Sequence, residues 1–249
     1  MILAVDIGNT NTNIGSFAGK KLISHSCINN TSLLKQKPAF TGKSHLLNES
    51  TNIVVASVNP DIESAFYKSL GKRYKKKVLK IGREIKLTIP ALVDNPQTVG
   101  IDRLLNALAA YRRTGTATIV IDFGTAITID VVSKKGEFLG GLILPGIRTS
   151  AYALNQQTAL LPKVEIKRPR KIIGKNSEDA IKAGIYYGAV GSVNHIIEEL
   201  NIAYEDLEYT IATGGDAKTL KKDIPEINKF IPHLTLEGIR LAFDENLNS

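Results

Sequence analysis

Two stretches of the chain that lie 116 positions apart, Ile2–Ile14 and Ile119–Asp130, follow nearly the same pattern. Each has an apolar run, then Asp-x-Gly, then small hydroxyl or amide residues, then β-branched residues. This pattern predicts a buried strand that ends in a carboxylate, turns at a glycine and returns as a second strand. Gly8 and Gly124 would let the backbone approach a ligand closely or adopt a positive φ, and the polar groups that follow can donate hydrogen bonds to phosphate oxygens. Two such loops in one chain indicate a duplicated domain that closes on a nucleotide.

A predicted helix ends the first half of the chain. It begins at Gly100-Ile101-Asp102-Arg103, has apolar residues at helical spacing, and ends near the basic residues and glycine at 112–115. We therefore expect one lobe at residues 1–113 and a second at 114–249. Within the first lobe, Pro60 is predicted to open a helix over 61–77, and residues 29–50 are predicted to form a polar, irregular surface region that could include a short helix.

The second lobe is predicted to repeat the opening strands and to contain a long helix. Asn176 and the acidic residues after it form a capping sequence for a helix that runs to about Leu200. Gly184, Gly188 and Gly191 fall near one face of that helix, where another backbone could pack closely.

Composition narrows the class of protein. The 249 residues are 43% hydrophobic and 22% charged, as in an ordinary soluble domain, and no apolar run approaches the ~20 residues of a membrane span. No signal sequence is apparent and Cys27 is the single cysteine, so we expect a reducing, cytoplasmic setting. The net charge is +8, with basic runs at 72–77 and 167–171. Few aromatic residues interleave with these runs, which favours solvated surfaces over a nucleic-acid site, and the positive field would attract anionic substrates.

Asp6 and Asp122 are predicted at equivalent strand ends. A carboxylate there can hold Mg²⁺ while the adjacent loop binds phosphates, or it can satisfy backbone amides in a turn. The presence of both favours ligand binding. Thr213-Gly214-Gly215, between a predicted strand and helix, would receive the adenine or ribose of the same nucleotide, and Asp216 would cap the helix.

Asp102 lies at the start of its predicted helix, two positions after Gly100. An acidic residue at this position caps backbone amides and offsets the helix dipole. It can equally act as a base that accepts a proton from a substrate hydroxyl, with Arg103 beside it binding an anion. The sequence leaves both interpretations open.

Other chemistries lack their motifs. The chain has neither the P-loop nor the Gly-x-Gly-x-x-Gly dinucleotide fingerprint, and it has no Gly-x-Ser-x-Gly nucleophile elbow. The four histidines, His25, His45, His195 and His233, are scattered without the spacing of a zinc site.

Together these motifs resemble those of type III pantothenate kinases, which belong to the acetate kinase, sugar kinase, Hsp70 and actin superfamily. The resemblance runs from Ile2 to about Leu241, and the Gly-x-Asp-Arg element combined with both loops is specific to the family. The matching segments are Asp6–Thr10, Gly100–Arg103, Asp122–Ala126, Gly140–Gly146, Thr158–Pro162 and Thr213–Gly215.

The resemblance implies a duplicated ribonuclease H-like (actin-like ATPase) α/β fold, with two lobes that each have a mixed five-stranded sheet flanked by helices. It implies phosphorylation of pantothenate by ATP, the first step of coenzyme A synthesis, with Mg²⁺ and a monovalent cation as cofactors. It also implies a homodimer whose active site lies at the subunit interface, with the glycine face near Gly184 as part of the contact.

Roles for individual residues follow from the same resemblance. Asp102 would be the general base, Asp6 would hold Mg²⁺, and Asp122 would bind potassium or ammonium. The ATP-binding residues would be Asp6, Ile7, Gly8, Asn9, Thr10, Asn11, Thr12, Asn13, Thr125, Gly214 and Gly215. The substrate-binding residues would be Gly100, Ile101, Asp102, Arg103, Val93 and Ser177.

Two positions depart from the family pattern. Val93 stands where a pantothenate-contacting tyrosine is common, and Ser177 stands where a threonine is common but keeps the hydroxyl. The valine leaves open another small-molecule kinase of the superfamily. The basic runs leave open a non-catalytic regulatory role, since the family includes a virulence-gene accessory factor.

Overall fold

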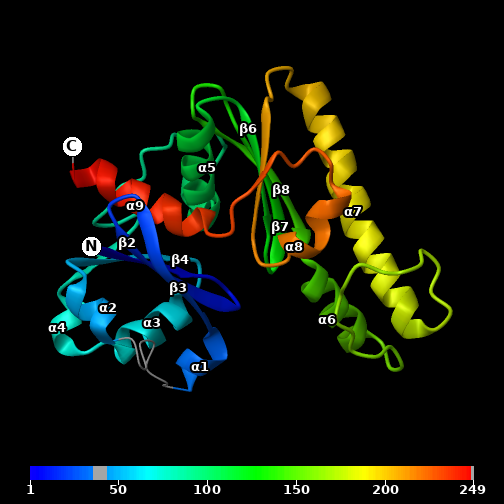
Figure 1. Cartoon of the computed structure of the whole chain (residues 1–249), viewed down its shortest axis with the longest axis horizontal. Coiled ribbons are helices and arrows are strands. Elements are labelled where there is room, and N and C mark those ends of the chain that lie inside the picture. Colours follow the sequence, from blue (N-terminus) through cyan, green and yellow to red (C-terminus); the bar gives the residue numbers. More distant parts are fainter. Residues whose placement is uncertain (36–43, 248–249) are drawn as a thin grey trace. The chain divides into compact units, whose positions relative to one another are not determined.

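The computed structural model describes residues 1–35 and 44–247 of the chain, which forms two compact units (Figure 1). One unit combines Met1–Arg113 with His233–Ser249, and the other is Thr114–Pro232. The sequence-based division placed 233–249 with the second lobe, whereas this segment groups with the first unit. Of the predicted irregular region at 29–50, residues 36–43 lie outside the described residues.

The first unit is built on a five-stranded sheet with the order β3-β2-β1-β4-β5. The pairs β1–β2 and β2–β3 are antiparallel, and β1–β4 and β4–β5 are parallel. The central strands β1 and β4 are almost fully buried, which is why both read as continuous apolar runs. The strands are β1 (Ile2–Ile7), β2 (Asn11–Ala18), β3 (Lys21–Asn29), β4 (Asn52–Ser57) and β5 (Val78–Lys80).

Helices cover both faces of this sheet. The helical segments are α1 (Asn30–Leu34), α2 (Ser44–Glu49), α3 (Pro60–Ser69), α4 (Lys72–Lys75), η1 (Pro96–Thr98), α5 (Ile101–Thr114) and α9 (Leu234–Leu247). On one face, Ile62 and Phe66 of α3 join the core formed by β1 and β4. The single helix predicted over 61–77 is wrong, because Leu70 adopts an extended conformation with its side chain buried and separates α3 from α4.

The last helix, α9, belongs to the first unit because of its packing. It contacts β1, β2 and β4, and a Cβ on Gly238 would collide with the carbonyl oxygen of Leu105 in α5. Thr235 donates a hydrogen bond of 2.8 Å to Asn106, and Arg113 pairs with Glu237. Helix α9 is therefore closely docked on α5 and on the first sheet.

The second unit repeats the topology of the first, with the sheet order β10-β9-β6-β7-β8. Here β6–β7 and β7–β8 are antiparallel, and β6–β9 and β9–β10 are parallel. The strands are β6 (Thr118–Phe123), β7 (Ala126–Val132), β8 (Phe138–Pro145), β9 (Tyr209–Thr213) and β10 (Lys229–Phe230), and the helical segments are α6 (Ile147–Gln157), α7 (Ser177–Ala203), α8 (Ala217–Leu220) and η2 (Lys221–Asp223). Both units thus run strand, strand, strand, helix in the same order, which confirms the predicted duplicated α/β fold.

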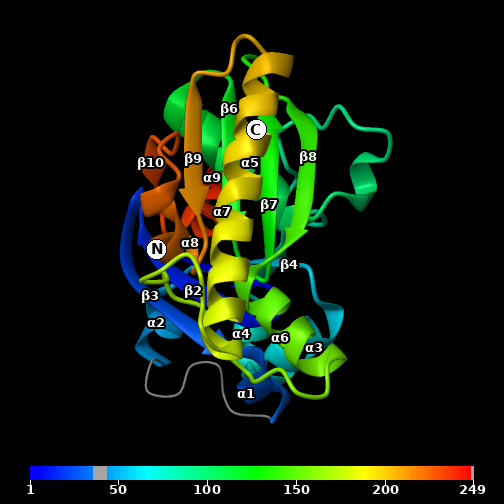
Figure 2. The same cartoon turned by 90° about the vertical axis from the view of Figure 1, so that its right-hand side faces the viewer.

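The long predicted helix is confirmed as α7, which lies across the second sheet (Figure 2). The Asn176 side chain accepts a hydrogen bond of 2.8 Å from the Asp179 amide, so the predicted cap is present. Tyr186, Val193 and Ile197 pack on the core of this unit. Gly184, Gly188 and Gly191 are exposed, and a Cβ at any of them would meet no atom within 4 Å. None of the helices in the described residues could span a membrane.

Candidate active site

The first loop joins β1 to β2 and leaves Asp6 at its edge. Asp6 pairs with Asn13 across the two strands, and the side-chain Nδ2 of Asn13 donates a hydrogen bond of 3.3 Å to Oδ2 of Asp6. The Gly8 amide donates to the Asn11 carbonyl at 3.0 Å. Gly8 does not have a positive φ, but a Cβ there would lie only 3.1 Å from the Asn11 oxygen. Glycine is therefore favoured at this turn by close approach of the backbone and not by a left-handed conformation.

Asn30, which was not identified as a site residue from the sequence, forms side-chain hydrogen bonds with this loop. Its side chain donates to the carbonyl of Gly8 and accepts from the hydroxyl of Thr12, each at 2.8 Å. Thr12 is fully buried, so its hydroxyl is committed to Asn30.

A cavity of about 390 Å³ adjoins the tip of the first loop. It lies among the loop and the starts of α1 and α3, and four of its lining residues are asparagines. Asn59, which caps α3, donates to the Asn9 side chain at 3.4 Å. The lining residues are Asn9, Thr10, Asn29, Asn30, Thr31, Leu34, Asn59, Asp61 and Ile62. Six of the nine lining residues thus carry uncharged side chains that can form hydrogen bonds.

The second loop, between β6 and β7, has the same form but is one residue shorter. Asp122 pairs with Thr128, whereas Asp6 pairs with Asn13, seven positions along. The Gly124 amide donates to the Ala126 carbonyl at 3.0 Å, and Gly124 also lacks a positive φ. The two acidic loops that the sequence predicted therefore occupy equivalent places in the two sheets.

The Thr213-Gly214-Gly215 segment lies directly against the second loop. Asp122 and Thr213 are register partners at the ends of the parallel strands β6 and β9. Gly214 has φ +92°, and a Cβ on it would collide with Asp122 Oδ1 and lie 2.6 Å from the backbone of Phe123. The structure thus brings Asp122, Thr125, Gly214 and Gly215 together at one end of the second sheet, as expected for strand ends in a parallel arrangement.

The predicted capping role of Asp216 is wrong, since its side chain makes no capping hydrogen bond at α8. Its carboxylate instead accepts hydrogen bonds from Nε and Nη2 of Arg148, at 2.9 and 2.6 Å. The Arg148 side chain remains two-thirds exposed, and a Cβ on Gly215 would lie 3.4 Å from Nη2. Arg148 is therefore an oriented cation beside the glycine pair, and it was not identified from the sequence.

Asp102 lies in the first turn of α5, as expected, and is its second residue. Its Oδ1 accepts a hydrogen bond of 2.9 Å from the Arg103 amide, and a Cβ on Gly100 would lie 2.6 Å from the same oxygen. Burial raises the pKa of Asp102, and the hydrogen bond from the Arg103 amide opposes that rise. A carboxylate that caps a helix and has a raised pKa can also act as a base, so the two interpretations of Asp102 are compatible.

The remaining predicted substrate residues lie in different units. Val93 is half-buried in the segment between β5 and η1, and Ile101 is the half-buried first residue of α5. Ser177 is the exposed first residue of α7 in the second unit.

Cation binding has to be judged from the donor groups. Among the residues that the structure describes, no group of three or more His, Cys, Asp and Glu side chains could hold a metal ion. Mg²⁺ in phosphoryl-transfer sites is held by one or two carboxylates, by substrate phosphates and by water, so Asp6 fits such an ion. Asp122 supplies a carboxylate oxygen beside the half-buried Gly214, which fits a cation that prefers oxygen ligands.

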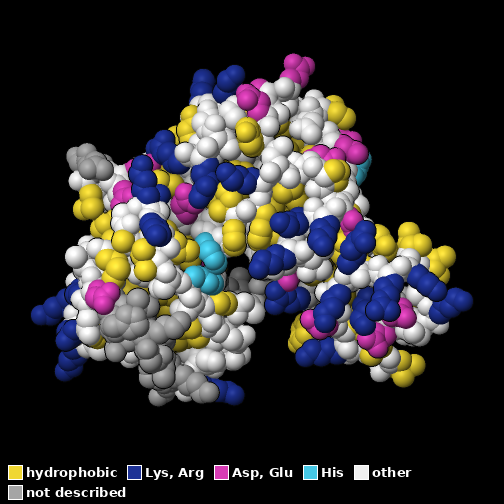
Figure 3. All heavy atoms as spheres, in the orientation of Figure 1, with side chains coloured by type: hydrophobic (Ala, Val, Ile, Leu, Met, Phe, Trp, Pro, Cys, Tyr) yellow, Lys and Arg dark blue, Asp and Glu magenta, His cyan; other side chains and the backbone are white. Residues whose placement is uncertain are grey.

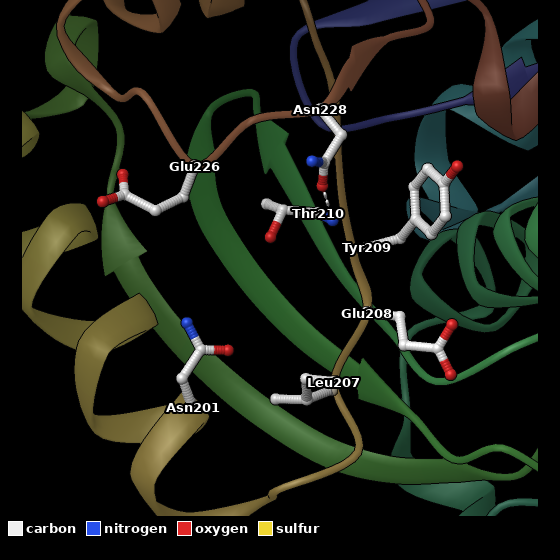
Figure 4. Close-up of a pocket in the computed structure, with 7 residues that line it drawn as sticks. All are labelled: Asn201, Leu207, Glu208, Tyr209, Thr210, Glu226 and Asn228. Atoms are coloured by element: carbon white, nitrogen blue, oxygen red, sulfur yellow. Dashed lines mark hydrogen bonds between the residues drawn. The ribbon is translucent and has the colours of Figure 1, made fainter.

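A second cavity, of about 240 Å³, lies in the second unit, at the end of β9 that is opposite to Thr213 and Gly214. Figure 4 shows the residues that line it. It surrounds Tyr209 and Thr210 at the start of β9, whereas Gly214 follows the end of that strand. Asn228 accepts a hydrogen bond of 2.6 Å from the Thr210 amide in this cavity. It is therefore separate from the loop residues.

The basic runs take part in ordinary intramolecular contacts. Lys and Arg side chains are spread over much of the face shown in Figure 3, together with Asp and Glu. Lys77 donates to the Ser50 carbonyl at 2.6 Å, and Arg168 forms a two-point ion pair with Asp223 at 2.8 and 2.9 Å. At least Lys77 and Arg168 of the basic runs therefore make contacts within the chain.

The comparison with known proteins decides the family. The family model for type III pantothenate kinase matches residues 2–199. The chain is 38% identical to the type III pantothenate kinase of Myxococcus xanthus, with 99% of each chain aligned. It is also 38% identical to the Moorella thermoacetica enzyme, over 99% of this chain and all of that protein. The chain belongs to the type III pantothenate kinase family.

Solved structures support the fold of this type III pantothenate kinase family member. A Campylobacter jejuni protein described as a Baf family transcriptional activator has a TM-score of 0.64 and 22% identity, over 99% of this chain and all of that one. The activator of 2-hydroxyisocaproyl-CoA dehydratase from Clostridium difficile, with bound ADPNP, has a TM-score of 0.54 and 14% identity, over 99% and 96% of the two chains. At these identities the likeness concerns the fold alone.

Proposed function

We propose that this type III pantothenate kinase family member transfers the γ-phosphoryl group of ATP to the hydroxyl of pantothenate, giving 4'-phosphopantothenate for coenzyme A synthesis in the cytoplasm. The observation that carries the proposal is the full-length identity of 38% with two type III pantothenate kinases. The aligned length includes both acidic loops and the Gly100–Arg103 element.

Both loops and the glycine pair would bind the nucleotide. We assign the ATP phosphates to the first loop from Asp6 to Asn13, apart from the buried Thr12 hydroxyl that is bonded to Asn30, and to Thr125, with Gly214 and Gly215 binding the nucleoside. Phosphoryl transfer depends mainly on positioning and on charge neutralisation, which suits loops whose backbone amides and short polar side chains can donate hydrogen bonds to phosphate oxygens. Asp6 would hold Mg²⁺, which neutralises phosphate charge when bound.

Asp102 would be the general base. Its carboxylate would accept the proton of the pantothenate hydroxyl as that oxygen attacks the γ-phosphorus, and ADP would leave with the electrons of the broken P–O bond. The raised pKa of Asp102 supports this role, because a base is most effective when its pKa approaches the working pH. Arg103, beside it, would bind the pantothenate carboxylate.

Asp122 would hold the monovalent cation, potassium or ammonium, near the phosphates. We also propose a homodimer in which pantothenate is enclosed at the subunit interface, with Ser177 contributing its hydroxyl. The exposed glycines of α7 support such an interface, since a second backbone could approach there without a steric barrier. Val93 in place of the usual tyrosine favours one alternative, a kinase of the same reaction type that acts on another small hydroxy acid.

The test measures ADP release with ATP, Mg²⁺ and pantothenate, with and without potassium, and identifies the product by mass. We expect one phosphate added to pantothenate and activity that needs the monovalent ion. ADP release with a different hydroxy acid while pantothenate stays unmodified would replace this proposal with the alternative. Absence of ADP release under all conditions would refute both.

A further inference from the structure

We propose that Asn30 is a positioning residue for the first loop, which keeps that loop in the shape that binds the ATP phosphates. The inference rests on the proposed function for its consequence in catalysis. Its geometric basis is independent of that function.

The side chain of Asn30 makes a two-sided bridge across the loop. Its Nδ2 donates to the carbonyl of Gly8, near the beginning of the loop, and its Oδ1 accepts from the Thr12 hydroxyl, at the end, each at 2.8 Å. In addition, the Asn30 backbone amide donates to the Thr10 carbonyl at 3.0 Å. One residue from another element therefore holds the start, middle and end of the loop.

Asn30 is only 3% exposed, and Thr12 is fully buried. A carboxamide buried in this way is costly unless its polar groups are paired, and here both ends are paired with the loop. Removal of the side chain would leave the Gly8 carbonyl and the Thr12 hydroxyl without these partners. The loop would then gain alternative conformations that let these groups reach water.

In the second unit, the loop between β6 and β7 is also held by the residues that follow the third strand, but through different groups. There, the residues that follow the third strand are Gly146 and the first turn of α6. The Gly146 amide and the Thr149 hydroxyl both donate to the Thr125 carbonyl, at 3.1 and 2.5 Å. In both units, the start of the helix after the third strand fixes the acidic loop. The first unit adds a side-chain bridge, and its loop is one residue longer.

This arrangement predicts a specific kinetic effect. If the loop keeps its binding shape in only about 1–10% of free molecules, the apparent affinity for ATP falls by about 10- to 100-fold. Saturating ATP would restore the shape, so kcat would change by less than about threefold. The KM for pantothenate would also stay within about threefold of wild type.

The experiment compares Asn30→Ala, Asn30→Leu and Thr12→Val with the wild-type chain. Leucine has the same branch point and the same number of side-chain heavy atoms as asparagine but neither donor nor acceptor, so together with alanine it separates hydrogen bonding from space filling. Thr12→Val keeps Asn30 and removes one hydroxyl, which provides a milder variant if the others fold poorly. Thr31→Ala is the matched control, because Thr31 lies in the same turn but its hydroxyl donates to Asn29 and not to the loop. Each protein is measured for KM and kcat, for ATP affinity without pantothenate, and for hydrogen exchange of the amides at 8–12 without nucleotide.

We expect both Asn30 variants to lose ATP affinity by about 10- to 100-fold and to lose exchange protection at 8–12, with protection at 123–126 unchanged. Thr12→Val should show a smaller loss and Thr31→Ala none. The inference would be overturned if Asn30→Leu bound ATP with wild-type affinity and kept wild-type exchange protection at 8–12. It would also be overturned if the KM for ATP and the KM for pantothenate rose by the same factor. If the wild-type chain binds ATP but does not phosphorylate pantothenate, the proposed function fails, while the affinity and exchange measurements still decide the role of Asn30.

Discussion

Gly214 offers a sharp test of how the second loop and the glycine pair depend on each other. Its φ of +92° lies in the left-handed region, and it is pressed against Asp122 and Phe123. An alanine at this position must place a Cβ into the Asp122 carboxylate and 2.6 Å from the Phe123 backbone. The perturbation therefore acts on backbone strain and on the position of Asp122 together.

Two contributions set the size of the effect. A residue other than glycine in a left-handed conformation costs about 1–2 kcal/mol. Overpacking against a rigid backbone costs about 1–3 kcal/mol. We therefore expect Gly214→Ala to lower the free energy of unfolding by about 2–5 kcal/mol and to weaken ATP binding, since the loop residues must move.

Gly215→Ala is the matched control. Its φ lies outside the left-handed region, and its Cβ would lie 3.4 Å from Nη2 of the flexible, exposed Arg148 side chain. We expect a change in unfolding free energy below about 0.5 kcal/mol for this variant, as for other surface substitutions. Urea denaturation followed by circular dichroism measures both. Equal stability of the two alanine variants would refute the reasoning.

Two further substitutions test the pKa shifts. Asp102→Asn should lower kcat by about 10²–10⁴-fold, the usual contribution of a general base, and the wild-type rate should rise with pH through the raised pKa of Asp102. A carboxyl whose pKa is raised by folding stabilises the fold only at low pH, so at pH 7 the melting temperature of Asp102→Asn should equal or exceed that of wild type; a lower one would contradict the burial argument. Hydrogen bonds from Arg168 and then Tyr186 lower the pKa of Asp223 to about 2, from 3.8. The difference in unfolding free energy between wild type and Asp223→Asn should therefore have its full size above pH 4 and disappear as the pH falls through about 2. Acid denaturation of both proteins measures it, and a difference that does not depend on pH would contradict this assignment.

The repeated strand pattern allowed much of the fold to be predicted, because alternation and apolar runs are local properties. Each Asp-x-Gly loop lies where the sequence placed it, and the Asn176 cap and α7 follow from local signals. The docking of α9 was not predictable in this way, because it depends on the close contact of Gly238 with Leu105, which lies more than a hundred positions away. The break at Leu70 likewise depends on a buried position that the sequence pattern of 61–77 does not indicate.

The candidate site shows the same division between local and distant causes. Asp6, Asp122 and the glycine pair carry signals in their own neighbourhoods, although the expected positive φ occurs at Gly214 and not at Gly8 or Gly124. Asn30 carries no such signal, since its bonds reach back about twenty positions to the loop. Asp216 was predicted to cap a helix because it precedes one, but its carboxylate instead accepts hydrogen bonds from Arg148 of α6.

The return of α9 to the first unit has a consequence for synthesis on the ribosome. The chain of the second unit is continuous from Thr114 to Pro232, whereas the first unit is interrupted by that whole segment. The second unit can therefore acquire all of its own contacts while the first sheet still awaits the 14-residue helix that covers β1, β2 and β4. During translation, the N-terminal half emerges first and is completed last.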